Sequence, residues 1–220
     1  MYLRRSARTL VLFALWLLLI ICGIWVSMEY EKTPARIANA AAQAKAIPTM
    51  PAGSSRSVTA NSATPNSFCP NYTPVLTGSK QYELVMFAHP QCPCTKATLS
   101  ELDRFLGRNN NVSTRVYFIV PNGFESWKNS ENFKAAARIP GVEVRIDENG
   151  VLAEKFKACA SGECFLFDRK ATLLFHGGIT VARGHEGDNL GLEQLSSIVE
   201  GRSLTAISNV VYGCTLFDAN

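Results

Sequence analysis

The sequence has no strong charge of either sign. Its 220 residues include 22 Lys and Arg and 18 Asp and Glu, which gives a formal net charge of +4. An excess this small does not indicate the large basic surface that nucleic-acid binding needs. The sequence also lacks an internal repeat, which excludes repeat architectures. Its length fits one domain of ordinary size with an additional segment.

One stretch near the N-terminus has no charge at all. Residues 10–28 are uncharged, and three arginines precede them. At about 1.5 Å per residue the stretch spans roughly 28 Å, close to the thickness of the hydrocarbon core of a bilayer. A cleaved signal peptide is the alternative, but the stretch is long for a signal peptide, and the nearest small-residue site, at 38–40, lies too far downstream. We therefore expect a retained transmembrane anchor.

The charges that flank this stretch predict its orientation. Arg4, Arg5 and Arg8 precede it, and Glu29 and Glu31 follow it. Positive charge stays on the cytoplasmic side of a membrane. We therefore expect a single-pass protein of the inner (plasma) membrane, with residues 1–9 in the cytoplasm and its domain in the periplasm or outside. Six cysteines then face an oxidising compartment, where disulfides persist: Cys69, Cys92, Cys94, Cys159, Cys164 and Cys214.

Composition divides the exported part into three segments. Residues 29–67 are rich in Ala, Pro and Ser, which predicts a tether. Residues 68–201 alternate between apolar strand patterns and helical patterns, which predicts an α/β domain with a central mixed sheet flanked by helices. The tail at 202–220 is too apolar to remain a solvated terminus, so we expect it to pack on the domain.

The expected elements of the domain alternate along the chain. Strands are expected at 82–88, 112–120 and 142–147, helices at 93–108, 125–139, 151–158 and 191–201, and a hairpin of two strands at 164–178. Helices that connect successive strands imply parallel pairing, and the hairpin adds antiparallel strands.

Two cysteines lie at the start of the first expected helix, directly after the first strand. Pro93 between them suits a first helical turn. A helix N-terminus lowers the pKa of a thiol through its free N–H groups and dipole, so we predict Cys92 as the nucleophile and Cys94 as a second catalytic residue. In a regular helix these two side chains point about 200° apart, so a bond between them would require an irregular first turn.

The order of elements, with a cysteine after the first long strand, resembles the thioredoxin superfamily. Within it, residues 145–158 and 164–178 are similar to segments of the membrane-tethered TlpA/ResA class, and the resemblance covers about residues 80–201. Residues 89–94 and 177–189 are also similar to a RedB-like group, which adds no mechanism. The resemblance implies a thioredoxin-like fold and thiol–disulfide oxidoreductase activity toward an extracytoplasmic protein thiol or disulfide.

The sequence departs from this family at two positions. Alignment with the family's C-x-x-C-K pattern places Cys92 on the nucleophile and Thr95 on the second cysteine, and Gly162 takes the place of the cis-proline. The nucleophile therefore needs a redox partner from elsewhere, for which the candidates are Cys214, Cys164 and Cys159. In particular, we predict that Cys214 lies within disulfide or ligand-sharing reach of residues 92–94.

The loop after the predicted hairpin is a second candidate segment. The hairpin's second strand returns toward Cys92, so the loop is expected beside the active site. Arg183, His185, Glu186 and Asp188 are candidates to position a substrate, tune the nucleophile or coordinate a metal. The alternative for these four residues is an ordinary solvated loop.

Two other functions fit the same residues. His89, Cys92 and Cys94 offer ligands that suit copper or zinc. Copper chaperones of the Sco type also have a thioredoxin-like fold with two cysteines, although theirs lie three residues apart. A non-enzymatic tethered docking module, in which the cysteines only form structural bridges, is the second alternative. We predict thiol chemistry that needs no cofactor.

Overall fold

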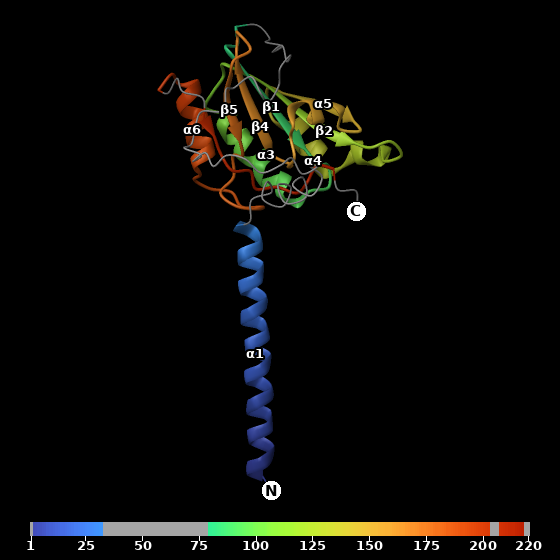
Figure 1. Cartoon of the computed structure of the whole chain (residues 1–220), viewed down its shortest axis with the longest axis vertical. Helices are drawn as coiled ribbons and strands as arrows, with labels where there is room; N and C mark the ends of the chain where they lie inside the picture. The colour runs from blue at the N-terminus through green and yellow to red at the C-terminus, as the bar shows by residue number, and fades with distance from the viewer. Residues whose placement is uncertain (1, 33–78, 203–206, 218–220) are drawn as a thin grey trace, which may run out of the picture. The chain divides into compact units, whose positions relative to one another are not determined.

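The structure is a computed structural model that describes residues 2–32, 79–202 and 207–217. Most of the predicted tether, the first residues of the predicted domain and Cys69 lie outside the described residues. The N-terminal unit is one helix, α1 (Tyr2–Lys32), drawn in blue in Figure 1. Its stretch Leu12–Tyr30 has a mean hydropathy of 2.2, and among the described helices it alone is long and apolar enough to cross a bilayer. A membrane anchor and a signal sequence both fit such a helix.

The domain is built on a six-stranded mixed sheet in the order β3-β2-β1-β4-β5-β6. Strand β1 (Tyr82–Ala88) is parallel to β2 (Val112–Val120), which is parallel to β3 (Val142–Glu148). On the other side of β1, β4 (Glu163–Asp168) is antiparallel to β1, and β5 (Leu173–Gly177) is antiparallel to β4. The short β6 (Ile207–Ser208) is parallel to β5. Figure 1 shows β2, β1, β4 and β5 side by side. The end of β1 therefore lies beside the start of β4.

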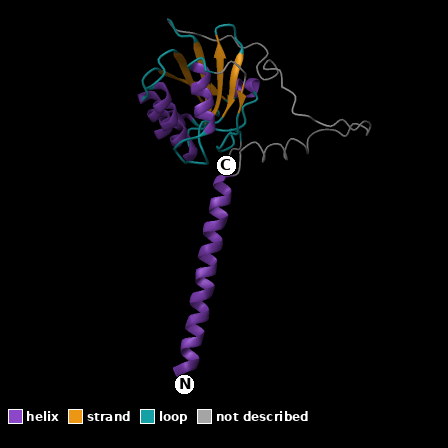
Figure 2. Cartoon of the chain, turned by 90° about the vertical axis from the view of Figure 1, so that its left-hand side faces the viewer, coloured by secondary structure: helices purple, strands orange, loops and turns teal. Residues whose placement is uncertain are grey.

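Helices cover both faces of the sheet (Figure 2). The helices are α3 (Pro93–Leu106), the 3₁₀ helix η2 (Glu125–Asn129), α4 (Glu131–Arg138), α5 (Val151–Phe156) and α6 (Leu190–Val199). One core joins Leu84 and Met86 of β1 to residues of α3, α4 and α6. The other joins Val85 and Phe87 to Ala153 and Phe156 of α5. Successive side chains of a strand point to opposite faces, so the continuous apolar run of β1 builds both cores.

The observed elements agree with the predicted α/β order, and one prediction is wrong. The helix expected at 125–139 is interrupted at Ser130, whose backbone is extended (φ −61°, ψ 157°). The Ser130 hydroxyl accepts the backbone N–H of Phe133 and so caps a new helix, α4. A serine cap satisfies N–H groups that would otherwise lack partners, which stabilises the break.

The described part of the C-terminal tail, residues 207–217, lies against the domain. Asn209 donates its backbone N–H to the carbonyl oxygen of His176 at 2.9 Å, and Gly178 donates to that of Val210 at 3.2 Å. Leu216 is 3% exposed and belongs to the core beneath α5. Below, we call residues 209–217 the C-terminal strap.

Candidate active site

The loop between β1 and α3 holds Cys92 at the start of a helix. Cys92 is the N-cap residue of α3, with an extended backbone (φ −73°, ψ 122°), and Pro93 occupies the first helical turn. The backbone N–H of Cys92 donates to the carbonyl oxygen of His89 at 3.2 Å. From α4, the side-chain amide of Asn132 donates to the carbonyl oxygens of Pro90 and Cys92 at 3.0 and 2.9 Å. The loop is therefore held both by a hydrogen bond within itself and by the side chain of Asn132 from α4.

Three cysteine sulfurs converge at this helix start. The Sγ atoms of Cys92, Cys94 and Cys214 all lie within 4.8 Å of one another, and we call this group the three-sulfur cluster. Cys92 is 2% exposed and Cys94 is 8% exposed. The three residues are thiols without a bond between them. The placement of Cys214 near residues 92–94 agrees with the prediction from the sequence.

In a regular helix Cys92 and Cys94 would point apart, so the sequence predicts that bringing their sulfurs together requires an irregular first turn. Cys92 instead precedes the first helical residue and has an extended backbone, so its side chain does not follow the helical spacing. The irregular first turn brings both sulfurs to one side.

The C-terminal strap brings Cys214 to the cluster through backbone pairing. The N–H of Ser161 donates to the carbonyl oxygen of Cys214 at 2.8 Å, and the N–H of Leu216 donates to that of Cys159 at 3.0 Å. A Cβ atom on Gly213 would lie 1.9 Å from the carbonyl oxygen of Ser161. The strap can approach this closely only because residue 213 is glycine.

Hydrogen bonds within the cluster separate the acidities of its thiols. The thiols of Cys214 and, second, Cys94 donate to the sulfur of Cys92, which lowers the pKa of Cys92 far below its ordinary value despite burial. The same bond to Cys92 raises the pKa of Cys214. Cys214 lowers the pKa of Cys94, but the bond to Cys92 and burial together raise it above its ordinary value. Cys92 therefore has the lowest pKa of the three thiols, and its role as the attacking sulfur stays a prediction.

Ser161, which the sequence did not indicate, links the nucleophile helix to the strap. Its hydroxyl lies 2.7 Å from the hydroxyl of Thr95 and accepts the backbone N–H of His89 at 2.9 Å. Thr95 is completely buried, so it fills its position as a structural group and supplies no thiol. No sequence pattern marks Ser161 or Asn132, because their contacts join segments that are far apart in the chain.

Gly162, at the predicted cis-proline position, adopts a left-handed backbone (φ +90°). Its N–H donates to the carbonyl oxygen of Phe87 at 2.8 Å, and a Cβ atom there would lie 2.8 Å from Oγ1 of Thr98. The described residues contain no cis peptide bond. Glycine is favoured at this position both by its positive φ and by the lack of space.

The other two candidate redox partners lie outside the three-sulfur cluster. Cys164 is fully buried in β4, where its thiol donates to the carbonyl oxygen of Gly162 at 3.5 Å. Burial, together with the charge of Glu163, raises the pKa of Cys164. Cys159 donates its thiol to the carbonyl oxygen of Lys157 at 3.4 Å. Cys214, and not these two, is the distant cysteine that reaches Cys92.

His89 is not part of the group that the structure brings together for a metal. Its Nδ1 accepts the backbone N–H of Gln91 at 3.2 Å, and its ring packs edge-on against Trp127 with centroids 4.9 Å apart. Burial lowers the pKa of His89, although the nearby charge of Cys92 acts in the opposite direction. The predicted ligand set of His89, Cys92 and Cys94 differs from the group whose ligand atoms lie close together, and metal binding by that set stays a prediction. Among the described residues, Cys214 takes the place of the histidine.

The loop after β5 contacts the C-terminal strap, next to Cys214, through the side chain of Arg183. The guanidinium group of Arg183 donates to the carbonyl oxygen of Gly213, next to Cys214, and its charge acts to lower the pKa of Cys94. His185 closes a turn by donating its backbone N–H to the carbonyl oxygen of Ala182 at 3.3 Å. Arg183 thus joins this loop to the C-terminal strap beside Cys214.

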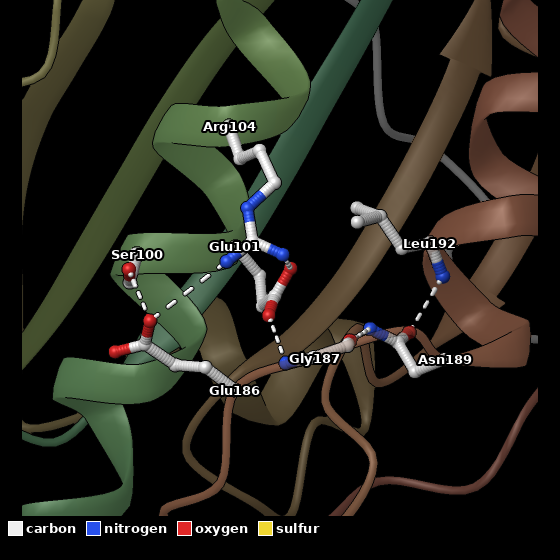
Figure 3. A network of polar contacts seen from close by, with 7 residues as sticks. All are labelled: Ser100, Glu101, Arg104, Glu186, Gly187, Asn189 and Leu192. Carbon is white, nitrogen blue, oxygen red and sulfur yellow. Dashed lines mark hydrogen bonds and ion pairs between the residues drawn. The ribbon is translucent and has the colours of Figure 1, made fainter.

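The end of the same loop is fastened to α3 (Figure 3). Glu186 accepts the hydroxyl of Ser100 at 2.8 Å and lies 3.9 Å from the guanidinium group of Arg104. The N–H of Gly187 donates to the buried carboxylate of Glu101 at 2.6 Å. Asp188 follows directly, before the N-cap of α6. These contacts position the loop, and they differ from the predicted role of Glu186 in binding a substrate or a metal.

A hollow opens beside the nucleophile loop. It has a volume of about 220 Å³ and is lined by His89, Ile119, Pro121, Trp127, Asn149, Leu216 and Phe217. Pockets that bury a whole small ligand measure about 300–1,000 Å³. The hollow therefore suits a single apolar side chain of a larger partner.

Comparisons with solved structures agree with this topology. An uncharacterised conserved protein from Geobacillus kaustophilus aligns with a TM-score of 0.50 and 21% identity, over 63% of this chain and 77% of that one. A hypothetical protein from Sinorhizobium meliloti aligns with a TM-score of 0.50 and 20% identity, over 63% and 80%. A thioredoxin-like protein from Aeropyrum pernix aligns with a TM-score of 0.41 and 18% identity, over 56% and 79%. No family model and no curated protein matches the sequence. The domain has the predicted α/β architecture, a central mixed sheet flanked by helices.

Proposed function

We propose that the protein is a membrane-anchored, extracytoplasmic thiol–disulfide oxidoreductase of the TlpA/ResA type, with Cys92 as its nucleophile. The observation that carries the proposal is the convergence of the sulfurs of Cys92, Cys94 and Cys214, all within 4.8 Å of one another, at the start of α3. A thiolate, not a thiol, attacks a disulfide. The hydrogen bonds stabilise that thiolate, and the thioredoxin-like fold positions it beside a hollow that suits a side chain of a protein substrate.

The reaction takes place in two exchange steps. The Cys92 thiolate attacks one sulfur of a substrate disulfide, which forms a mixed disulfide and releases the other substrate sulfur as a thiolate. The thiol of Cys214 then passes its proton to the released thiolate and attacks the sulfur of Cys92. A Cys92–Cys214 disulfide forms, and the second substrate sulfur leaves. The substrate disulfide is reduced by two electrons, and the same steps in reverse oxidise a substrate dithiol.

Cys214 is the better resolving residue for geometric reasons. Its sulfur comes from a separate segment of the chain and belongs to the same three-sulfur cluster as Cys92. Cys94 is equally near, but a bond between residues two apart closes a very short loop around Pro93 and stores strain. The structure thus supplies from the C-terminal strap the thiol that Thr95 does not provide.

The mechanism is tested by mixing the reduced full chain, kept in detergent, with a disulfide-bonded peptide and measuring thiol–disulfide exchange between them. Cys92→Ser should abolish exchange. Cys214→Ser should accumulate the mixed disulfide, whereas Cys94→Ser should complete the reaction, and Cys159→Ser serves as a control outside the cluster. Exchange that persists in Cys92→Ser overturns the proposal and favours a docking module. Accumulation of the mixed disulfide in Cys94→Ser alone would assign resolution to Cys94.

The orientation of the anchor is part of the proposal. Three arginines precede the apolar stretch and acidic residues follow it, which favours a cytoplasmic N-terminus. A reporter enzyme that works only outside the cytoplasm should be active when fused after Asn220. Replacing Arg4, Arg5 and Arg8 with glutamate should reduce that activity. A soluble mature form that begins near Ala41 would contradict the retained anchor.

A further inference from the structure

We propose that the three-sulfur cluster of Cys92, Cys94 and Cys214 is also a binding site for one Cu(I) ion. Thiol–disulfide exchange needs two sulfurs, and the structure assembles three within 4.8 Å of one another. The sulfur of Cys94 therefore forms no bond in the proposed exchange reaction. Soft thiolate ligands select Cu(I) among the common metal ions of proteins.

The spacing of the sulfurs fits coordination to a single ion. Metal–sulfur bonds are about 2.3 Å long, as in zinc sites. Three sulfurs arranged around one ion at that distance lie about 4 Å apart. The observed separations, all within 4.8 Å, need only small side-chain movements to reach this arrangement.

The number of ligands favours Cu(I) over Zn²⁺. Structural zinc sites have four protein ligands, and catalytic ones keep a fourth position for water. Among the described residues, no histidine, carboxylate or further cysteine joins the three sulfurs. Cys92 and Cys94 are 2% and 8% exposed, which leaves little room for a water ligand. Cys214 is partly exposed, so two of the three sulfurs are buried, and such a set of three thiolates suits an ion of low coordination number.

The surroundings compensate the charge of such a complex. Each copper–sulfur bond that replaces an S–H bond releases a proton to solvent, so three thiolates with Cu(I) carry two net negative charges. The guanidinium group of Arg183 reaches the carbonyl oxygen of Gly213, and its charge acts on Cys94. The N-terminus of α3, where Cys92 is the N-cap, adds a partial positive charge.

Titration with Cu(I) against a competing chromophoric chelator tests the site, using the reduced full chain in detergent without oxygen. One ion should bind per chain. Cys92→Ser, Cys94→Ser and Cys214→Ser should each weaken binding by more than about 100-fold, beyond the loss typical for residues that only orient a ligand. Cys159→Ser and His89→Ala are matched controls that should bind as the unchanged protein does. Zn²⁺ should not displace the bound Cu(I).

Alkylation provides a second readout that needs no variant. Bound Cu(I) should protect the three cluster cysteines from iodoacetamide and leave Cys159 reactive. Unchanged binding in Cys214→Ser, equal loss in His89→Ala, or displacement by Zn²⁺ would overturn the inference. Failure to bind Cu(I) in a chain that still exchanges disulfides rejects this site alone. Binding without any exchange rejects the proposed function and leaves the site standing.

Discussion

The backbone N–H of Ser161 donates a 2.8 Å hydrogen bond to the carbonyl oxygen of Cys214, while the Ser161 hydroxyl lies 2.7 Å from that of Thr95. One residue thus connects the C-terminal strap to the helix that carries Cys92. Because Ser161 and Thr95 are both buried, the relative positions of the nucleophile and Cys214 depend on Ser161. The cluster is therefore held by ordinary protein hydrogen bonds even when no bond joins its sulfurs.

Removing the Ser161 hydroxyl should destabilise the domain. In Ser161→Ala, the hydroxyl of Thr95 and the N–H of His89 both lose a buried partner. A buried polar group left without its partner costs about 1–3 kcal/mol. We expect a loss of this size in the free energy of unfolding, measured with urea. The control is Ser100→Ala, which removes an exposed bond to Glu186 and should change little; equal losses in both variants would contradict the prediction.

A methyl group at residue 213 should displace the strap. In Gly213→Ala, the new Cβ atom would meet the carbonyl oxygen of Ser161 at 1.9 Å, so the backbone must move. Forced overpacking costs about 1–3 kcal/mol. Cys214 should also be alkylated faster, because its contact with Cys92 is lost.

Gly107→Ala is the matched control for this change. Gly107 has a helical backbone (φ −60°), and a Cβ atom there would make an ordinary 3.4 Å contact with the carbonyl oxygen of Asp103. Its stability and the alkylation of Cys214 should remain those of the unchanged chain. If Gly213→Ala behaves like this control, the strap is not held by close backbone contact.

The hydrophobic patterns of the sequence predicted the strands of the sheet well. The apolar run at 82–88 and the alternation around it gave β1 with its observed bounds, since a strand buried on both faces has few other interpretations. The boundary at Ser130 was missed because a serine inside a helical pattern carries no mark of whether it will act as a cap.

The active site was predictable in part. The Cys-Pro-Cys segment after a strand indicates a reactive thiol, and the apolar tail indicated that Cys214 returns to the domain. The convergence of Cys92 with Cys94 depends on an extended N-cap, which the helical periodicity does not reveal. The contacts of Ser161 and Asn132 depend on tertiary packing, for which a single sequence gives no signal.

Breaking the buried charge pair of Glu83 and Arg115 should strongly destabilise the domain. Glu83 is completely buried in β1, and Arg115 of β2 pairs with it. Arg115→Met would remove the cation that pairs with this buried carboxylate, which costs about 3–5 kcal/mol. Urea unfolding should show this loss. The double variant Glu83→Leu with Arg115→Met should recover most of it, because no buried charge remains.

Arg145→Met is the control for the unfolding measurement on Arg115→Met. Arg145 and Arg115 both contact Glu143, but the side chain of Arg145 is 58% exposed and that of Arg115 is 7% exposed. Exposed ion pairs contribute at most about 1 kcal/mol. A loss in Arg115→Met no larger than in Arg145→Met would show that burial of Glu83 does not determine the cost.

The pH dependence of alkylation should identify Cys92 as the thiolate. The hydrogen bond from the thiol of Cys214, and second that from Cys94, lower the pKa of Cys92. A lowered pKa keeps the thiolate present at pH values below about 8.5, the ordinary pKa of a cysteine. Iodoacetamide should therefore modify Cys92 in the folded chain at a nearly constant rate from pH 6 to 9. In the urea-unfolded chain the rate should fall about tenfold for each pH unit below 8.5.

Removing the thiols of Cys214 or Cys94 should shift the pH profile of Cys92 alkylation to higher pH. Cys214→Ala removes the main donor, so the pKa of Cys92 should rise toward its ordinary value, and Cys94→Ala should raise it less. Burial opposes ionisation of Cys92 in the unchanged chain and in both variants alike, so the change in pKa reports the lost thiol donor. Cys159→Ser, outside the cluster, should leave the profile unchanged. An unchanged Cys92 profile in Cys214→Ala would mean that the helix N-terminus alone stabilises the thiolate, and the strap would then have no part in activating the nucleophile.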